Sequence, residues 1–293
     1  MRGGRAACTR RVVVDHASWS EGGGVASGMA MTLAPPPGTN VDAVAGEAQP
    51  GRVRVLVIFG GRSSEHSISC VSAAGVLRAL SQGQHDVRAV GILPDGRWVE
   101  ADTDPAALQA VGRELPSVSD QGEPVALLPE PGGGAGSAVG PMRILRDIDV
   151  VFPVLHGPWG EDGTVQGLLE MAGIPYVGSG VFASSVAMDK GHMKAMLAQA
   201  GLPVGPYEVV TPREWRIDPA GSRARIESLG YPLFVKPCRA GSSVGISRVT
   251  TPGGLDATIA EAQRWDPRII VEAAVVGGRE IECGVLVDET GQP

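Results

Sequence analysis

The first strong pattern along the chain is a largely apolar run over residues 53–59 (VRVLVIF), rich in β-branched side chains and ended by two glycines. A run of this kind is typical of a buried parallel strand. Helical spacing of apolar residues follows over 69–80, and residues 86–93 predict another strand. Strand, glycine turn, helix and strand together predict a βαβ unit.

The same pattern returns further along the chain. Residues 149–155 predict another buried strand, and a helix is expected from Thr164 to about Ala172, after a glycine-rich turn. We therefore expect residues 51–180 to form an N-terminal domain built on an open parallel α/β sheet.

Beyond Gly180 the pattern changes to α+β. Helices are expected over 181–188 and 192–200, separated near Gly191. Strand-like segments then follow, with helical stretches between some of them: 207–211, 233–238, 246–250, 269–276 and 281–288. We expect a central domain over 181–268 and the incomplete start of a C-terminal domain over 269–293.

Two segments show no such periodicity. Residues 1–50 contain runs of glycine and proline and sustain neither a helical nor a strand period, which predicts a disordered or spurious extension. Met29 and Met31 offer later start sites within it. Residues 131–140 (PGGGAGSAVG) predict an exposed loop.

Composition narrows the classes of function. The chain has 293 residues, of which 43% are hydrophobic and 19% charged, so it can bury a sizeable core. A formal net charge of −7 argues against a broad nucleic-acid-binding surface and against binding to anionic membranes. The sequence contains no run of 18 apolar residues, so no transmembrane helix is predicted. The four cysteines lack metal-ligand spacing, which favours a reduced, cytoplasmic chain.

Lysine is scarce in this sequence. Only Lys190, Lys194 and Lys236 are lysines among the 25 basic residues. Lysine is a compact point charge and arginine a planar fork, so a lysine in an arginine-biased chain can mark a site whose geometry requires it. Chance retention is the alternative. Lys194, one helical turn after Lys190, is expected to be an ordinary surface residue.

Two loops carry polar side chains at the ends of predicted strands, where α/β proteins place their ligands. Residues 60–66 (GGRSSEH) place Glu65 near a helix start, where it either contacts a ligand or supports the helix N-terminus. Residues 156–164 (HGPWGEDGT) begin with His156 and offer Glu161 and Asp162 as caps for the next helix. Taken alone, both loops are also explained by turn and capping chemistry.

A third segment, 234–245 (FVKPCRAGSSVG), sets Lys236 on a strand beside a Gly-Ser-Ser-Val-Gly loop. An ammonium group with hydroxyls and backbone N–H groups suits phosphate oxygens, although a hairpin with a surface lysine is the alternative. Neither G-x-x-x-x-G-K-[ST] nor G-x-G-x-x-G occurs, which argues against a P-loop NTPase and a dinucleotide-binding fold. A fourth segment comprises residues 270–272 and 277–282. Its Glu272 lies either in an adenosine pocket or on a solvated strand edge.

In this order and spacing, with Met188-Asp189-Lys190 between the second and third, the four segments resemble the D-alanine-D-alanine ligase family of the ATP-grasp superfamily over about residues 52–293. The resemblance implies an N-terminal α/β domain, a central domain and a C-terminal domain, with ATP held between the last two. It implies ATP-dependent ligation of two D-alanines through a D-alanyl phosphate, for peptidoglycan synthesis. Mg²⁺ or Mn²⁺ is the implied cofactor, and a cytoplasmic homodimer the implied assembly.

The resemblance also implies roles for the matched residues. Glu65 and Ser242 match positions that orient the first D-alanine, and His156 matches a histidine near the same substrate. Lys190 and Lys236 match contacts to the ATP phosphates. The remaining ATP-binding positions comprise the loop over the phosphates and the adenine and ribose contacts: Gly241, Ser242, Ser243, Val244, Glu272, Val275 and Glu280. The turn at 275–278 is one residue longer than in the family pattern. Two alignments of the adenine-binding positions, one residue apart, therefore stay open.

In the family, the metal ligands and an arginine that stabilises the transition state lie beyond the position of Glu280. From this we predict that the chain is a fragment without ligase activity, and no metal ligand is assigned in it. Two alternatives stay open at this point. One is another ATP-grasp carboxylate-amine ligase, and the other is a non-catalytic nucleotide-binding remnant.

Overall fold

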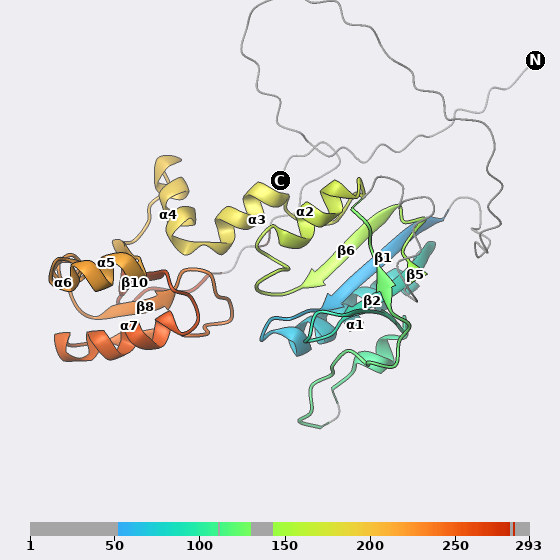
Figure 1. Ribbon diagram of the computed structural model, residues 1–293, viewed down its shortest axis with the longest axis horizontal. Helices are drawn as coiled ribbons and strands as arrows, with labels where there is room; N and C mark the ends of the chain where they lie inside the picture. Colours follow the sequence, from blue (N-terminus) through green and yellow to red (C-terminus); the bar gives the residue numbers. More distant parts are fainter. Residues whose placement is uncertain (1–51, 111, 130–142, 282–283, 285–293) are drawn as a thin grey trace, which may run out of the picture. The chain divides into compact units, whose positions relative to one another are not determined.

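A computed structural model describes residues 52–110, 112–129, 143–281 and 284 (Figure 1). The predicted extension at 1–50, the loop at 131–140 and nearly all of the strand expected at 281–288 lie outside the described residues. Residues Gln49–Gly278 form one compact unit, and the fold described below belongs to it.

The first sheet is centred on β1 (Val53–Gly60) and has the strand order β3-β2-β1-β6. Both β2 (His85–Ile92) and β6 (Val150–Leu155) run parallel to β1, as the predicted α/β sheet requires. The antiparallel edge strand β3 (Trp98–Ala101) was not predicted. It has four residues, of which only Val99 is fully buried, and so few positions give no periodic signal.

Side chains of β1 alternate between two apolar clusters, one on each face of the first sheet. Val57 and Phe59 pack with α1 (His66–Ser81), whereas Ile58 packs with α2 (Thr164–Met171). Burial on both faces explains why β1 is apolar at almost every position. The chain also forms a 3₁₀ turn at Pro105–Leu108 and a small parallel pair, β4 (Val125–Ala126) with β5 (Arg143–Ile144).

Two consecutive helices, α3 (Val181–Met188) and α4 (Lys190–Gln199), follow the first sheet. The expected break near Gly191 lies instead at Asp189, so α4 begins two residues earlier than predicted. Asp189 ends α3 and caps α4, because its side chain accepts hydrogen bonds from the N–H groups of Gly191 (3.0 Å) and His192 (3.1 Å).

The second sheet is antiparallel, with the strand order β7-β10-β8-β9. Its core face carries Val235 and Val271, which pack with Ile226 and Ile259 from helices. The elements of this part are β7 (Tyr207–Val210), α5 (Pro212–Ile217), α6 (Pro219–Glu227), β8 (Leu233–Pro237), β9 (Ser247–Val249), a 3₁₀ turn (Pro252–Gly254), α7 (Leu255–Gln263) and β10 (Ile269–Ala273).

β10 is shorter than predicted. Residues 269–276 were expected to be one strand, but β10 ends at Ala273, and Val275 and Val276 are 79% and 82% exposed. Apolar residues therefore continue in the sequence after the strand has ended, but there they are exposed and do not indicate a buried strand. None of the helices within the described ranges combines the length and apolar character that crossing a bilayer requires.

Candidate functional site

Glu65 lies between β1 and α1, in the short loop over residues 61–65. Although it directly precedes α1, its side chain makes no capping hydrogen bond to the helix. The Ser242 hydroxyl instead donates a hydrogen bond to the Glu65 carboxylate. The Glu65 side chain therefore does not cap α1 and pairs with another loop instead. The loop after β1 is joined to the loop after β8.

Glycines make room for this carboxylate. A Cβ atom placed on Gly157 would lie 2.5 Å from Glu65 Oε2, and one placed on Gly241 would lie 2.9 Å from the same oxygen. Gly157 also has a φ of +73°, a conformation that residues with side chains rarely adopt. The Glu65 carboxylate thus lies close against both glycines, and the backbone conformation of Gly157 itself favours glycine.

His156 follows β6 and is held through both backbone and side chain. Its carbonyl oxygen accepts a hydrogen bond from the Ser63 hydroxyl (2.7 Å), and its Nε2 lies 3.0 Å from Ser72 Oγ. His156 Nδ1 is 3.9 Å from the Glu161 carboxylate. Glu161 does not cap α2 as expected, because it accepts the Gly157 N–H (2.8 Å) and so shapes the loop.

The predicted cap at Asp162 is also displaced by one residue. Gly163 occupies the capping position of α2, while Asp162 accepts hydrogen bonds from the backbone N–H groups of Trp159 (2.9 Å) and Thr164 (3.0 Å). Asp162 therefore organises the whole turn between β6 and α2.

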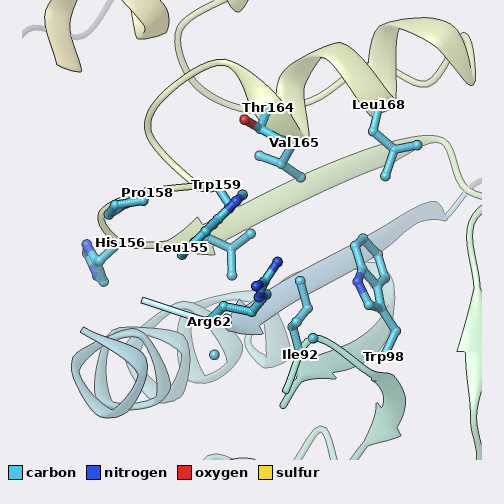
Figure 2. Close-up of a pocket in the computed structure, with 14 residues that line it drawn as sticks. Arg62, Ile92, Trp98, Leu155, His156, Pro158, Trp159, Thr164, Val165 and Leu168 are labelled. Atoms are coloured by element: carbon cyan, nitrogen blue, oxygen red, sulfur yellow. The ribbon is translucent and has the colours of Figure 1, made fainter. Parts of the chain in front are cut away.

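A cavity of about 260 Å³ borders His156 at the ends of β1 and β6 (Figure 2). Most of its lining is apolar and comes from Ile92, Trp98, Leu155, Val165 and Leu168. The Arg62 guanidinium lies over the Trp159 ring, 4.6 Å from its centroid, and both side chains belong to this lining. The cavity lies at the carboxyl ends of parallel strands, where open α/β sheets bind ligands.

The three lysines gather on the face of the second sheet opposite its apolar core. In the strand register Glu272 lies opposite Phe234 and Lys236 opposite Ile270, so Lys236 and Glu272 are diagonal neighbours on one face. The Lys236 ammonium contacts the Glu272 carboxylate. Lys194 Nζ lies 2.8 Å from Glu272 Oε1. We call Lys190, Lys194, Lys236 and Glu272 the lysine cluster.

Two interpretations from the sequence are wrong here. Lys194 was expected on the surface, but its side chain is 16% exposed. Glu272 was considered as part of a solvated edge, but its side chain is 12% exposed. A buried carboxylate requires cationic partners, which the two lysines supply. Lysine scarcity is the signal that could have drawn attention to Lys194, because its four-residue spacing from Lys190 indicates only a shared helix face.

Lys190 connects this cluster to the loop after β8. As the first residue of α4, it donates from Nζ to the carbonyl oxygen of Ala240 (2.5 Å). Ser242 and Ser243, in the same loop, have positive φ angles of 45° and 61°. Such a conformation costs about 1 kcal/mol or more per residue other than glycine and is often retained at functional sites. One short loop thus contacts Lys190 at Ala240 and Glu65 at Ser242.

Charge and burial change the protonation equilibria of the lysine cluster. Burial alone would raise the pKa of Glu272, but hydrogen bonds and charge from Lys194 and Lys236 outweigh it and hold this pKa below its usual value of 4.5. Burial, and then the charge of Lys236, lower the pKa of the Lys190 ammonium. With three ammonium groups around one carboxylate, the cluster favours an additional anion.

The lowered pKa of Glu272 predicts how acid changes stability. The ionised carboxylate contributes stability above its unfolded pKa, and this contribution is lost as the pH falls through its lower folded value. Glu272→Gln is therefore expected to be less stable than the original chain at pH 7, with a difference that shrinks below about pH 4.5. Urea unfolding between pH 7 and pH 3 measures this difference. Glu261→Gln is the matched control, because the Glu261 carboxylate pairs with Arg264 at a position 44% exposed on α7. A gap for Glu272→Gln that stays constant across this range would contradict the prediction.

The described unit brings the lysine cluster, the loop 240–243 and Glu65 together. Val275 is exposed beyond β10. Glu280 lies outside the unit Gln49–Gly278, and its expected contact stays a prediction.

A divalent metal ion such as Mg²⁺ or Mn²⁺ needs several oxygen ligands at one place. Within the described ranges, no group of three or more His, Cys, Asp or Glu side chains is arranged to hold a metal ion. The described residues therefore do not fit such a site.

Family models match both parts of this architecture. The model described as D-ala D-ala ligase N-terminus matches residues 54–179, and the model described as D-ala D-ala ligase C-terminus matches residues 196–292. The chain belongs to the D-alanine–D-alanine ligase family. The matched ranges contain Glu65 and His156 in the first model, and Lys236, Ser242 and Glu272 in the second.

Curated relatives have the same name. The chain is 54% identical over 247 residues to a D-alanine–D-alanine ligase of Mycobacterium tuberculosis, covering 83% of this chain and 65% of the relative. It is 53% identical over 255 residues to one of Kineococcus radiotolerans, covering 84% and 66% respectively. The chain thus spans about 65% of the length of these relatives.

Solved structures share the fold. The VanG D-Ala:D-Ser ligase of Enterococcus faecalis matches with a TM-score of 0.63 at 33% identity, covering 77% of this chain and 64% of that one. The D-alanine-D-alanine ligase of Coxiella burnetii matches with a TM-score of 0.64 at 31% identity, covering 77% and 65%. The predicted combination of an α/β domain with an ATP-grasp fold is therefore confirmed, whereas the boundaries at 180 and 268 stay predictions.

Proposed function

We propose that this chain contributes the ATP site and the first D-alanine site of an enzyme that ligates two D-alanines through a D-alanyl phosphate, for peptidoglycan synthesis. The observation that carries the proposal is the loop 240–243, which contacts Lys190 of the lysine cluster at one end and Glu65 at the other. A phosphate donor and an amino-acid acceptor bound at these two places would lie on either side of one short loop. Family membership supports the same activity.

Each group has a role that its chemistry suits. Lys190 and Lys236 would bind phosphate oxygens as point charges, together with the backbone and hydroxyls of Gly241, Ser242, Ser243 and Val244. Glu65 would bind the ammonium group of the first D-alanine, oriented by Ser242, with His156 beside the same substrate. Glu272, Val275 and Glu280 stay predictions as adenosine contacts. The cytoplasm and a homodimer also stay predictions.

The reaction requires activation because a carboxylate is a poor electrophile. Transfer of the γ-phosphoryl group to the carboxylate of the first D-alanine gives an acyl phosphate, which the amine of the second D-alanine attacks with loss of phosphate. Negative charge develops on phosphoryl oxygens, so the protein contributes mainly positioning and positive charge. The ammonium groups of Lys190 and Lys236 would provide that charge.

Calorimetric titration of the chain with ATP and D-alanine tests the proposal. We expect ATP to bind, and D-alanine to bind in preference to L-alanine. A folded chain that binds ATP but no D-alanine would favour a ligase acting on another acid and amine, or a nucleotide-binding remnant. A folded chain that binds neither ligand would refute the proposal.

The Glu65–Ser242 contact gives a more specific prediction. Glu65→Gln removes the negative charge that would pair with the substrate ammonium, and is expected to weaken D-alanine binding by about tenfold or more. Ser242→Ala keeps the charge and is expected to cause a smaller loss. D-alanine titrations monitored by calorimetry measure both, with Glu170→Gln on α2 as the control. Equal affinities in all these variants would remove Glu65 from the substrate site.

A further inference from the structure

The two oxygens of the Glu272 carboxylate have different lysine partners. Oε1 lies 2.8 Å from Lys194 Nζ, and Oε2 contacts Lys236 Nζ. The family resemblance implies a phosphate-binding role for Lys236 and none for Lys194. Phosphate oxygens that bind Lys236 would compete with the Glu272 carboxylate for its ammonium group, so the second partner determines what happens to Glu272 when that contact is lost.

Lys194 is the more enclosed of the two partners. Its side chain is 16% exposed, compared with 25% for Lys236. The Lys194 ammonium also lies 5.5 Å from the centroid of the Tyr207 ring, and Tyr207 is the residue opposite Glu272 in the β7–β10 register. One helix and two strands thus fix the position of Lys194 relative to Glu272.

Lys236 is more accessible. It lies on β8, two residues before Cys238, whose carbonyl oxygen accepts the Lys190 backbone N–H (3.0 Å). An anion held between Lys190 and Lys236 would compete directly with Glu272 Oε2 for the Lys236 ammonium. It would leave the contact between Lys194 and Glu272 Oε1 intact.

We propose that Lys194 is a positioning residue of the nucleotide site, which holds Glu272 as the exchangeable counter-ion of Lys236. Without nucleotide, Glu272 bridges Lys194 and Lys236. When phosphate oxygens bind Lys236, Lys194 remains paired with Glu272, so the buried carboxylate is not left without a cation. The inference rests on the proposed ATP binding and adds to it a residue that touches no phosphate.

Removing the Lys194 charge tests this role. In Lys194→Met the apolar stem is kept, but Glu272 retains only Lys236 as its partner, and the phosphates must separate that last pair. We expect the Kd for ATP to rise about tenfold. The Kd for adenosine should change less than twofold, because without phosphate Glu272 keeps its pair with Lys236 and stays in place for any adenosine contact. Lys194→Arg keeps the charge and is expected to stay within about threefold of the original chain for ATP.

A double-mutant cycle with Glu272→Gln separates this mechanism from others. If Lys194 acts through Glu272, adding Lys194→Met to Glu272→Gln changes the Kd for ATP less than twofold. A tenfold loss in both backgrounds would mean that Lys194 acts on the phosphates directly and would overturn the proposal. Arg264→Met is the matched control, because Arg264 is 73% exposed at the end of α7, which packs on the opposite face of the sheet.

Further measurements cover the remaining outcomes. A purely structural role would lower the thermal midpoint and weaken ATP and adenosine equally, without rescue by Lys194→Arg, and would overturn the inference. An unchanged Kd for ATP in a folded Lys194→Met would overturn it as well, while leaving the proposed function intact. A folded original chain that binds no ATP would refute the proposed function, and this inference with it.

Discussion

Replacing Lys236 by alanine is expected to weaken ATP binding by about 10- to 100-fold, because a hydrogen bond between charged groups in a protein contributes about 1.5–3 kcal/mol. Lys236 is held on β8 between two buried residues, with its ammonium 5.7 Å from the Phe234 ring centroid and in contact with Glu272. Its removal takes one positive charge from the predicted phosphate site and leaves the Glu272 carboxylate facing the incoming phosphates. Both effects weaken the binding of a polyphosphate.

Calorimetric or fluorescence titration with ATP measures this loss, and the affinity for adenosine should change far less. Arg264→Ala on α7 also removes one positive charge, at an exposed position on the opposite side of the sheet, and is expected to bind ATP normally. If Lys236→Ala and Arg264→Ala bound ATP equally well, Lys236 would not be a phosphate ligand.

The largest expected effect on stability comes from Phe59→Ala. Phe59 lies in the central strand of the first sheet, is 1% exposed, and packs against the side of α1 that carries Ala73 and Leu77. Truncation of a buried phenylalanine removes its transfer free energy and leaves a cavity, and we expect a loss of about 3–5 kcal/mol in the free energy of unfolding. Because β1 leads into the loop that holds Glu65, the same change is expected to weaken D-alanine binding.

Urea unfolding followed by circular dichroism measures the loss. Met171→Ala is the matched control: it also truncates a large apolar side chain, but Met171 is 62% exposed on α2, so its change should remain within about 0.5 kcal/mol. A loss for Phe59→Ala as small as that of the control would mean that β1 is not the centre of a packed core.

The elements of this protein follow largely from local pattern. β1 is apolar at nearly every position because both faces are covered, and this pattern predicts a parallel strand without tertiary information. The glycines after β1 and the α+β succession beyond Gly180 are equally local signals. Element ends were less predictable: α4 begins at Lys190 because Asp189 supplies a cap, and β10 ends at Ala273 although apolar residues continue.

The sequence by itself determined the family, the order of elements and the residues with suitable chemistry, because motif spacing, periodicity and residue type are properties of the chain. Only the tertiary structure decided which of these residues meet. Ser242 and Glu65 are 177 positions apart, and their contact depends on how the loops after β1 and β8 are placed. Lys194 seemed an ordinary surface residue in the sequence, since its spacing from Lys190 predicts only a shared helix face. Its burial depends on an ion pair with Glu272, which lies on β10. An ion pair between residues so far apart in the chain leaves no periodic signal in the sequence.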